Sequence, residues 1–175
     1  MSDNENEEKL TPSLILKVFA EQEETDKLIR KLTEDIIGIS NYNKEIVEDM
    51  IYNTLNKDKT FAGIKFDDID RNVKLHSKFL NLDGEFDIVL ENGDTVAIIE
   101  TKYKVEKDDI TDLVEKKTIN FRKLFPMFSD YKIILGIGGM SFENEAITEA
   151  KEKGIGIIKI SGDTVEYYTE NIKTY

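Results

Sequence analysis

The apolar residues in the first third of the chain recur at helical spacing. Near-heptad positions hold Leu14, Val18, Ile29, Leu32 and Ile36. Thr11 can cap a helix that begins with Pro12, so the pattern predicts a long helix over residues 12–37. The polar stretch 21–26 interrupts the apolar stripe. This leaves two interpretations: a helix packed along the domain, or an arm that oligomerises as a coiled coil.

A second helix is predicted over residues 41–55, after a break at Gly38-Ile39-Ser40. Its apolar face consists of Ile46, Val47, Met50, Ile51 and Leu55. On a helical wheel Glu48 lies about 20° from Leu55, at the margin of this face.

From residue 69 onward, alternating and continuous apolar runs predict strands at residues 69–82, 85–90, 95–105, 131–138 and 155–160, with a last edge strand at 164–169. Helices are expected from Asp108 or Asp109 to Phe125, and over residues 142–153 before Gly154. Residues 60–70 are predicted as a loop or a partial edge strand. The fold class is therefore α/β, with a central mixed sheet of four to five strands flanked by helices.

The strands at 85–90 and 95–105 form a predicted hairpin. Asn92-Gly93 favours a two-residue type I′ turn, and Asp83-Gly84 is a second turn signal. With Asn92-Gly93 as the loop, Glu85 lies opposite Glu100, and Asp87 lies diagonal to Glu100.

This register brings Asp87, Glu100 and Lys102 to one face of the hairpin, with Glu85 close by. Buried like charges destabilise a fold unless a cation lies among them. Mg²⁺ prefers oxygen ligands and is often held by one or two carboxylates. We therefore expect Asp87 and Glu100 to bind Mg²⁺, with Mn²⁺ as a substitute and the backbone carbonyl of Thr101 as a further ligand. Lys102 would orient the attacking water and stabilise charge on the phosphate.

The arrangement of Asp87, followed by Glu100-Thr101-Lys102, resembles the motif of the PD-(D/E)xK nuclease superfamily. Phe86 stands where the motif name has proline. The resemblance covers roughly residues 41–175, and more narrowly the chain resembles largely uncharacterised members with a coiled-coil-like N-terminal helix. It implies a restriction-endonuclease-like core and metal-dependent cleavage of phosphodiester bonds.

The resemblance also implies roles for three further residues. Glu48 matches a glutamate on the first core helix that reaches the metal site, as a direct or water-mediated ligand; a solvated glutamate is the alternative. Lys117 matches a helical residue that contacts substrate, the alternative being a lysine whose stem covers the core and whose amine is solvated. Lys104 is a second predicted substrate contact. One metal ion suffices, and Glu85 with Glu48 could support a second.

The composition limits which kinds of catalytic site and which cellular location are expected. The chain has 175 residues, no cysteine and one histidine, His76, which excludes thiol catalysis and Cys-type zinc sites. No apolar run approaches membrane-spanning length, and the start is not a signal peptide, so a cytoplasmic protein is expected. The domains predicted are an acidic disordered tail at 1–10, a helical arm at 11–40 and a nuclease-like domain at 41–175.

Charge leaves two function classes open. The net charge is −12, of which residues 1–50 carry −7, so DNA binding should be weak and metal-dependent. The first hypothesis is a Mg²⁺-dependent deoxyribonuclease. The second is an inactive nuclease-fold module that binds nucleic acid or protein, assembling as a homodimer through its N-terminal helix. The sequence does not fix whether the substrate is duplex, single-stranded, branched or RNA.

Overall fold

The computed structural model describes residues 11–175; the tail predicted at residues 1–10 lies outside this range. Internal contacts divide the chain into two units, Met1–Asn41 and Tyr42–Tyr175. The helices are α1 (Pro12–Asp58), α2 (Lys107–Asp112), the π-helical η1 (Leu113–Lys117), α3 (Thr118–Leu124), the 3-10 turn η2 (Pro126–Phe128) and α4 (Asn144–Lys153). The strands are β1 (Thr60–Phe61), β2 (Ile64–Lys65), β3 (Asp68–Ser77), β4 (Leu82–Glu91), β5 (Thr95–Val105), β6 (Lys132–Phe142), β7 (Gly156–Ser161) and β8 (Thr164–Tyr168).

Helix α1 begins where the sequence predicts, but it does not break. The Leu14 N–H donates to Thr11 Oγ1 at 3.3 Å, which confirms the N-cap. The predicted break at Gly38–Ser40 is wrong, because the helix is continuous to Asp58. A glycine inside a helix costs only about 1 kcal/mol, and without a proline the backbone hydrogen bonds can run through it.

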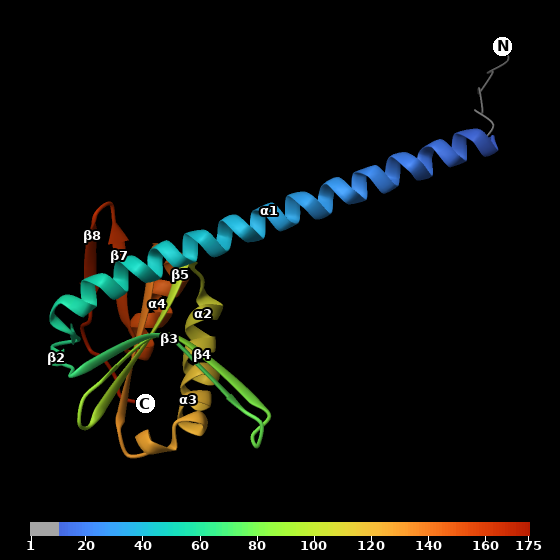
Figure 1. Ribbon diagram of the computed structural model, residues 1–175. Coiled ribbons are helices and arrows are strands. Elements are labelled where there is room, and N and C mark those ends of the chain that lie inside the picture. Colours follow the sequence, from blue (N-terminus) through green and yellow to red (C-terminus); the bar gives the residue numbers. More distant parts are fainter. Residues whose placement is uncertain (1–10) are drawn as a thin grey trace, which may run out of the picture. The chain divides into compact units, whose positions relative to one another are not determined.

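The second unit is built on a mixed six-stranded sheet in the order β3-β4-β5-β6-β7-β8, with a separate β1–β2 hairpin (Figure 1). Strands β5, β6 and β7 are parallel, and the outer pairs are antiparallel. The α/β class is confirmed, but the predicted four to five strands are too few, because β3 and β8 extend both edges.

Each face of the sheet carries its own apolar core. Helices α2, α3 and α4 with η1 cover one face, where Ile98, Phe121 and Ala150 are buried together. The other face packs against the part of α1 in the second unit and against the β1–β2 hairpin; Ile51 and Phe61 belong to this core. A β-carbon on Gly138 of β6 would lie 2.2 Å from Ile51 Cδ1, so glycine permits this close packing of α1 on the sheet.

The β4–β5 hairpin forms with a different register from the one predicted. Ile88 pairs with Ile99 and Glu91 with Val96, a shift of two residues. The reason is the loop: Asn92 Oδ1 accepts the N–H groups of Asp94 and Thr95. This side-chain turn makes a longer loop than a type I′ turn. A shift of two keeps the paired residues 88–91 on their predicted faces, since strands have a period of two.

The β3–β4 turn lies before the predicted Asp83-Gly84 position, because β4 already begins at Leu82. Asn81 has a φ of 47°, and the Leu80 N–H donates to Ser77 Oγ. Gly84 serves close packing instead: a β-carbon there would lie 2.2 Å from Leu124 Cδ1.

Other elements match their predictions closely. Strand β5 has the predicted bounds, β8 is an edge strand, and α4 ends at Gly154, which has a left-handed φ of 67°. Residues 60–70 contain the β1–β2 hairpin and the start of β3. Within residues 11–175 we find no helix with the length and hydrophobicity needed to span a membrane.

The packing of α1 on the sheet predicts that Ile51→Ala lowers the free energy of unfolding by about 2–5 kcal/mol, because it leaves a cavity around a fully buried side chain. Ile119→Ala on α3 is the matched control, since that side chain is 49% exposed. Urea unfolding followed by circular dichroism measures both. Equal losses for the two variants would contradict this assignment of the core.

Candidate functional site

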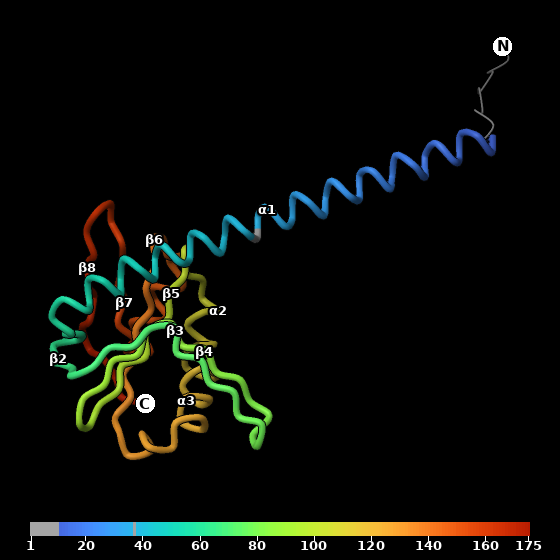
Figure 2. Tube along the Cα trace, in the orientation of Figure 1, coloured from blue at the N-terminus to red at the C-terminus, as the bar shows by residue number. Residues whose placement is uncertain are grey.

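Partway along their shared ladder, strands β3 and β4 both turn over. Side chains that would share one face of a regular strand therefore lie on opposite faces of the sheet. Val73 and Phe86 pack in the core under α2–α4, whereas Ile69 and Ile88 pack in the core under α1. Residues an even number apart on a regular strand share a face, so both strands must twist over between these positions. Figure 2 shows the β3–β4 ribbon bending near its middle and continuing away from the other strands.

The twist is located at one residue pair, Asn72 and Asp87. The ladder pairs Arg71 with Ile88 and Val73 with Phe86 but lacks the pair between them. Asn72 has a φ of 52°, in the left-handed region that asparagine tolerates better than most residues. The fold therefore frees Asp87 from regular pairing.

The carboxylate of Asp87 takes the place of a backbone partner for β5. The backbone N–H of Thr101 donates to Asp87 Oδ2 at 2.8 Å, and the Thr101 hydroxyl donates to the same oxygen at 3.0 Å. Lys44 Nζ donates to Asp87 Oδ1 at 2.9 Å. Asp87 is only 1% exposed, so it is a buried charge with three donors around it.

Glu100, on the adjacent strand, is also buried but is less well satisfied. Lys117 Nζ lies 3.0 Å from Glu100 Oε2, while Glu100 Oε1 is buried and has no hydrogen-bond partner among the described residues. Burial, and next the nearby charge of Asp87, raise the pKa of Glu100 to about 7, although Lys117 and Lys44 act in the opposite direction. Glu100 therefore changes its charge near neutral pH.

Lys117 reaches Glu100 from the last residue of the π-helical segment η1. The Thr118 hydroxyl donates to the carbonyl of Leu113, five residues earlier, which stabilises the wide turn. The Lys117 amine also donates to the backbone carbonyl of Glu85 and lies 5.5 Å from the centre of the Phe86 ring. Single π-helical turns within α-helices often occur at functional sites.

Helix α1 contributes two charged residues to the site, Lys44 and Glu48. Burial alone would lower the pKa of Lys44, but attraction to Asp87 and the hydrogen bond with it outweigh this, so that pKa is raised. Glu48 is buried, and its burial followed by repulsion from Asp87 raises its pKa. Glu48 was predicted as a site residue from the sequence, whereas Lys44 was not. Lys44 stands one helical turn before Glu48, so the two share a face of α1, and this spacing could have indicated it.

The lysines predicted on β5 form their ion pairs with other acids. Lys102 Nζ lies 3.1 Å from Asp109 Oδ1. Asp109 also accepts the Glu106 N–H at the start of α2. Lys104 pairs with Glu143 at 2.6 Å and with Glu106 at 3.3 Å.

Glu85 does not lie opposite Glu100 as predicted. The ladder between β4 and β5 covers only residues 88–91 and 96–99, so it does not reach Glu85. On the other side of β4, Glu85 pairs with Lys74 of β3, and their side chains form an ion pair of 3.1 Å. The carboxylates that the fold brings together are thus Asp87 and Glu100, with Glu48 beside Asp87.

The donor set suits a hard cation with few protein ligands. Within residues 11–175 no group of three or more Asp, Glu, His or Cys side chains is close enough to form a metal cage. Mg²⁺, however, is often held by one or two carboxylates, with water and substrate phosphate at the other positions. The partnerless Oε1 of Glu100 provides a buried oxygen ligand, so Asp87 and Glu100 fit this ion.

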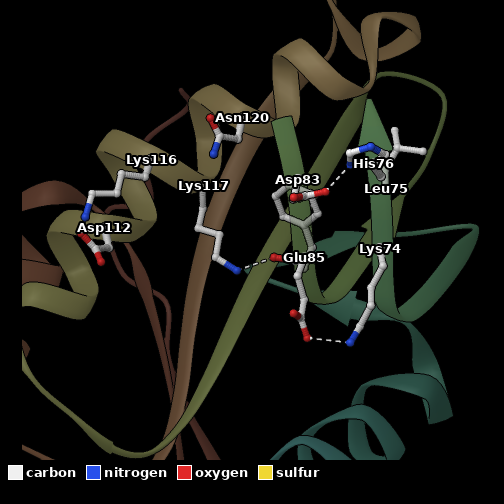
Figure 3. Close-up of a pocket in the computed structure, with 11 residues that line it drawn as sticks. Lys74, Leu75, His76, Asp83, Glu85, Asp112, Lys116, Lys117 and Asn120 are labelled. Carbon is white, nitrogen blue, oxygen red and sulfur yellow. Dashed lines mark hydrogen bonds and ion pairs between the residues drawn. The ribbon is translucent and has the colours of Figure 1, made fainter. Parts of the chain in front are cut away.

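A pocket of about 610 Å³ lies beside these carboxylates, between the β3–β4 ribbon and the helical segment α2–η1–α3. Its lining includes Lys74, His76, Glu85, Lys117 and Asn120. Figure 3 shows the Lys117 amine directed toward Glu85. Because the same amine contacts Glu100, it links the pocket to the buried carboxylates.

Comparison with known proteins places residues 43–167 within one family model, described as a domain of unknown function (DUF8196). No curated protein and no solved structure matches the chain. The matched range includes the carboxylates, the lysines around them and the pocket.

The raised pKa of Glu100 predicts a pH-dependent stability of the metal-free protein. The unfolded chain releases this proton near the ordinary pKa of 4.5, whereas the folded protein retains it up to about pH 7. The free energy of unfolding should therefore fall from pH 5 to pH 7.5, by on the order of 3 kcal/mol. Glu100→Gln should remove this decline and be the more stable protein at pH 8.

Urea titrations in EDTA across this pH range measure the effect. Glu85→Gln is the control, because Glu85 is exposed and should keep the wild-type pH dependence. A Glu100→Gln protein with the same decline as wild type would contradict the assigned pKa.

Proposed function

The chain belongs to the DUF8196 family, and we propose that it is a magnesium-dependent nuclease that hydrolyses phosphodiester bonds, most readily those of DNA. The observation that carries this proposal is the buried, partnerless Oε1 of Glu100 next to the buried carboxylate of Asp87. Leaving a buried polar atom unpaired costs about 1–3 kcal/mol. A function that uses this oxygen accounts for its retention better than folding does.

Asp87 and Glu100 would hold the ion, the backbone carbonyl of Thr101 would add a ligand, and Glu48 would assist from α1. A bound Mg²⁺ supplies positive charge where the phosphate develops negative charge. Asp87 is held rigidly for this role, because the Thr101 N–H and hydroxyl fix its Oδ2. Rigid placement of such a group is what catalysis by charge stabilisation requires.

The lysines around the carboxylates have separate roles in the proposal. Lys117 contacts Glu100 and lines the pocket, so it suits contact with a substrate phosphate. Lys102 would leave its ion pair with Asp109 when the substrate binds. It would then orient the attacking water and stabilise charge in the transition state. Lys104 would contact the substrate strand farther along β5. Lys44 holds the Asp87 carboxylate in place through their hydrogen bond.

DNA is a plausible partner despite a net charge of −12. Lys44 and Lys117 lie at the carboxylates, and Lys74 and Lys116 line the pocket, so amines are available here although each pairs with an acid in the free protein. Binding should nevertheless be weak and depend on the metal ion, because few cations are available to replace the counterions of the phosphate backbone.

A second candidate is a nuclease-fold module without catalytic activity. It is favoured by the ion pairs that already neutralise Asp87 and Glu100, since Lys44 and Lys117 lie where a cation would be useful. The unit Met1–Asn41 also carries exposed apolar residues, among them Ile29, Leu32 and Ile36. In this alternative the helix pairs with a second copy of the chain, and the module binds nucleic acid or protein.

Cleavage assays test the nuclease proposal directly. Labelled plasmid, linear duplex, single strand, branched DNA and RNA are incubated with protein in millimolar Mg²⁺ or Mn²⁺. Glu100→Gln and Lys102→Met should each lower the rate by on the order of 10²–10⁴-fold, as the loss of a group acting in the transition state does. Lys123→Met, at an exposed residue of α3 outside the pocket lining, should cleave like wild type. Cleavage that survives both site substitutions would disprove the proposal.

Metal-dependent stability separates the two candidates. Millimolar Mg²⁺ at 100 times its dissociation constant stabilises a folded protein by about 2.7 kcal/mol, which for this chain length raises the unfolding midpoint by about 5–10 °C. Wild type should show this rise relative to EDTA, and Asp87→Asn should not. Equal midpoints with and without metal in wild type would favour the non-catalytic module.

A further inference from the structure

We propose that the 610 Å³ pocket receives one unpaired nucleotide of the substrate strand, so that the enzyme acts on single-stranded or branched DNA instead of continuous duplex. This inference rests on the proposed nuclease function and adds its substrate class. Pockets of about 300–1,000 Å³ bind single small molecules. A volume of this size accommodates one nucleotide, whereas a base that remains paired in a duplex carries its partner strand with it.

The position of the pocket next to the carboxylates supports this assignment. One amine, that of Lys117, contacts both the Glu85 carbonyl in the pocket lining and the Glu100 carboxylate, 3.0 Å away. A phosphate joined to a nucleotide in the pocket therefore comes within reach of Lys117 and of Glu100. The pocket and the proposed cleavage site can bind neighbouring parts of one strand.

The lining offers contacts for each part of a nucleotide. Leu75 contributes apolar surface and the exposed ring of His76 a stacking face for a base, and Asn120 contributes an amide that can bind a base edge. Lys74 and Lys116 bring two amines for phosphate oxygens. Figure 3 shows that these groups come from opposite walls, with the strand residues on one side and Asn120 and Lys116 on the helical side.

Charge explains why recognition should depend on one nucleotide. The lysines of the lining are partly neutralised, since Lys74 pairs with Glu85 at 3.1 Å and Lys116 with Asp112 at 2.6 Å. A protein with a net charge of −12 gains little from following a long duplex backbone. Base contacts in a pocket are far less dependent on net charge, and each is worth a substantial part of the affinity for single strands.

The inference is tested by binding of fluorescein-labelled oligonucleotides with cleavage-resistant phosphorothioate linkages to the full chain, in millimolar Mg²⁺ at low salt. Three probes are compared: a blunt duplex, the same duplex with a single-stranded flap, and dAMP as a competitor. Wild type should bind the flap at least about tenfold more tightly than the blunt duplex, the gain expected from one base contact. Free dAMP should compete only weakly, because it lacks the neighbouring phosphates.

Two substitutions locate the binding. Asn120→Trp fills the pocket and should abolish the preference for the flap. Lys116→Ala adds no bulk and should weaken flap binding by about fivefold through loss of one phosphate contact. Lys123→Ala is the matched control on α3, outside the lining, and should bind like wild type. Thermal unfolding midpoints verify that each variant is folded.

Equal affinity for flap and blunt duplex, or flap binding unchanged in both folded pocket variants, would overturn the inference. So would dAMP binding as tight as that of the flap, which would indicate a site for a free nucleotide. The nuclease proposal is judged separately, by cleavage in Mg²⁺. Pocket-dependent flap binding without cleavage would support the nucleotide-binding pocket and contradict the nuclease function. Cleavage of blunt duplex that Asn120→Trp does not affect would support the nuclease function and contradict the pocket.

Discussion

The arrangement of the site depends on the reversal of faces in the β3–β4 ribbon at Asn72 and Asp87. A regular ladder would use Asp87 as an ordinary strand residue and would give Thr101 a carbonyl partner from β4. The left-handed φ of Asn72 and the missing pair remove both constraints. The Asp87 carboxylate then joins β4 to β5 itself, through the N–H and hydroxyl of Thr101. At the proposed catalytic site, the link between β4 and β5 is therefore made by a polar side chain instead of by backbone hydrogen bonds.

Two buried acids in one place require compensation, and the fold provides it from two directions. Lys44 approaches Asp87 from α1, and Lys117 approaches Glu100 from η1, which covers the opposite face of the sheet. Each pair offsets part of the desolvation of its carboxylate. The compensation is incomplete at Glu100, whose second oxygen has no partner among residues 11–175. Burial and the charge of Asp87 raise the pKa of Glu100, and the nearby amines of Lys117 and Lys44 lower it, so a further cation beside this oxygen would lower it as well.

Local sequence patterns predicted much of the fold, whereas contacts between residues far apart in the chain could not be predicted from the sequence. The apolar run of β5 and the Gly154 helix end were sufficient to place those elements, and an acid at the end of a buried strand identified Glu100 as a residue to examine. The predicted register was wrong because the Asn92 side chain accepts two backbone N–H groups and closes a longer loop than a type I′ turn. Lys44 went unnoticed because a lysine on a helix surface is ordinary until the tertiary fold places it against Asp87.

The π-helical turn at Leu113–Lys117 has a consequence for how this helical stretch can diverge. A π turn holds one residue more than an α turn, so the side chains beyond it stand where they would in a regular α-helix one residue shorter. Deleting a single residue from the turn would therefore leave a regular α-helix with its apolar stripe in phase on both sides, but without the wide turn from which Lys117 reaches Glu100. Related chains that lack this residue should keep the helix and its packing and lose the contact between the two side chains.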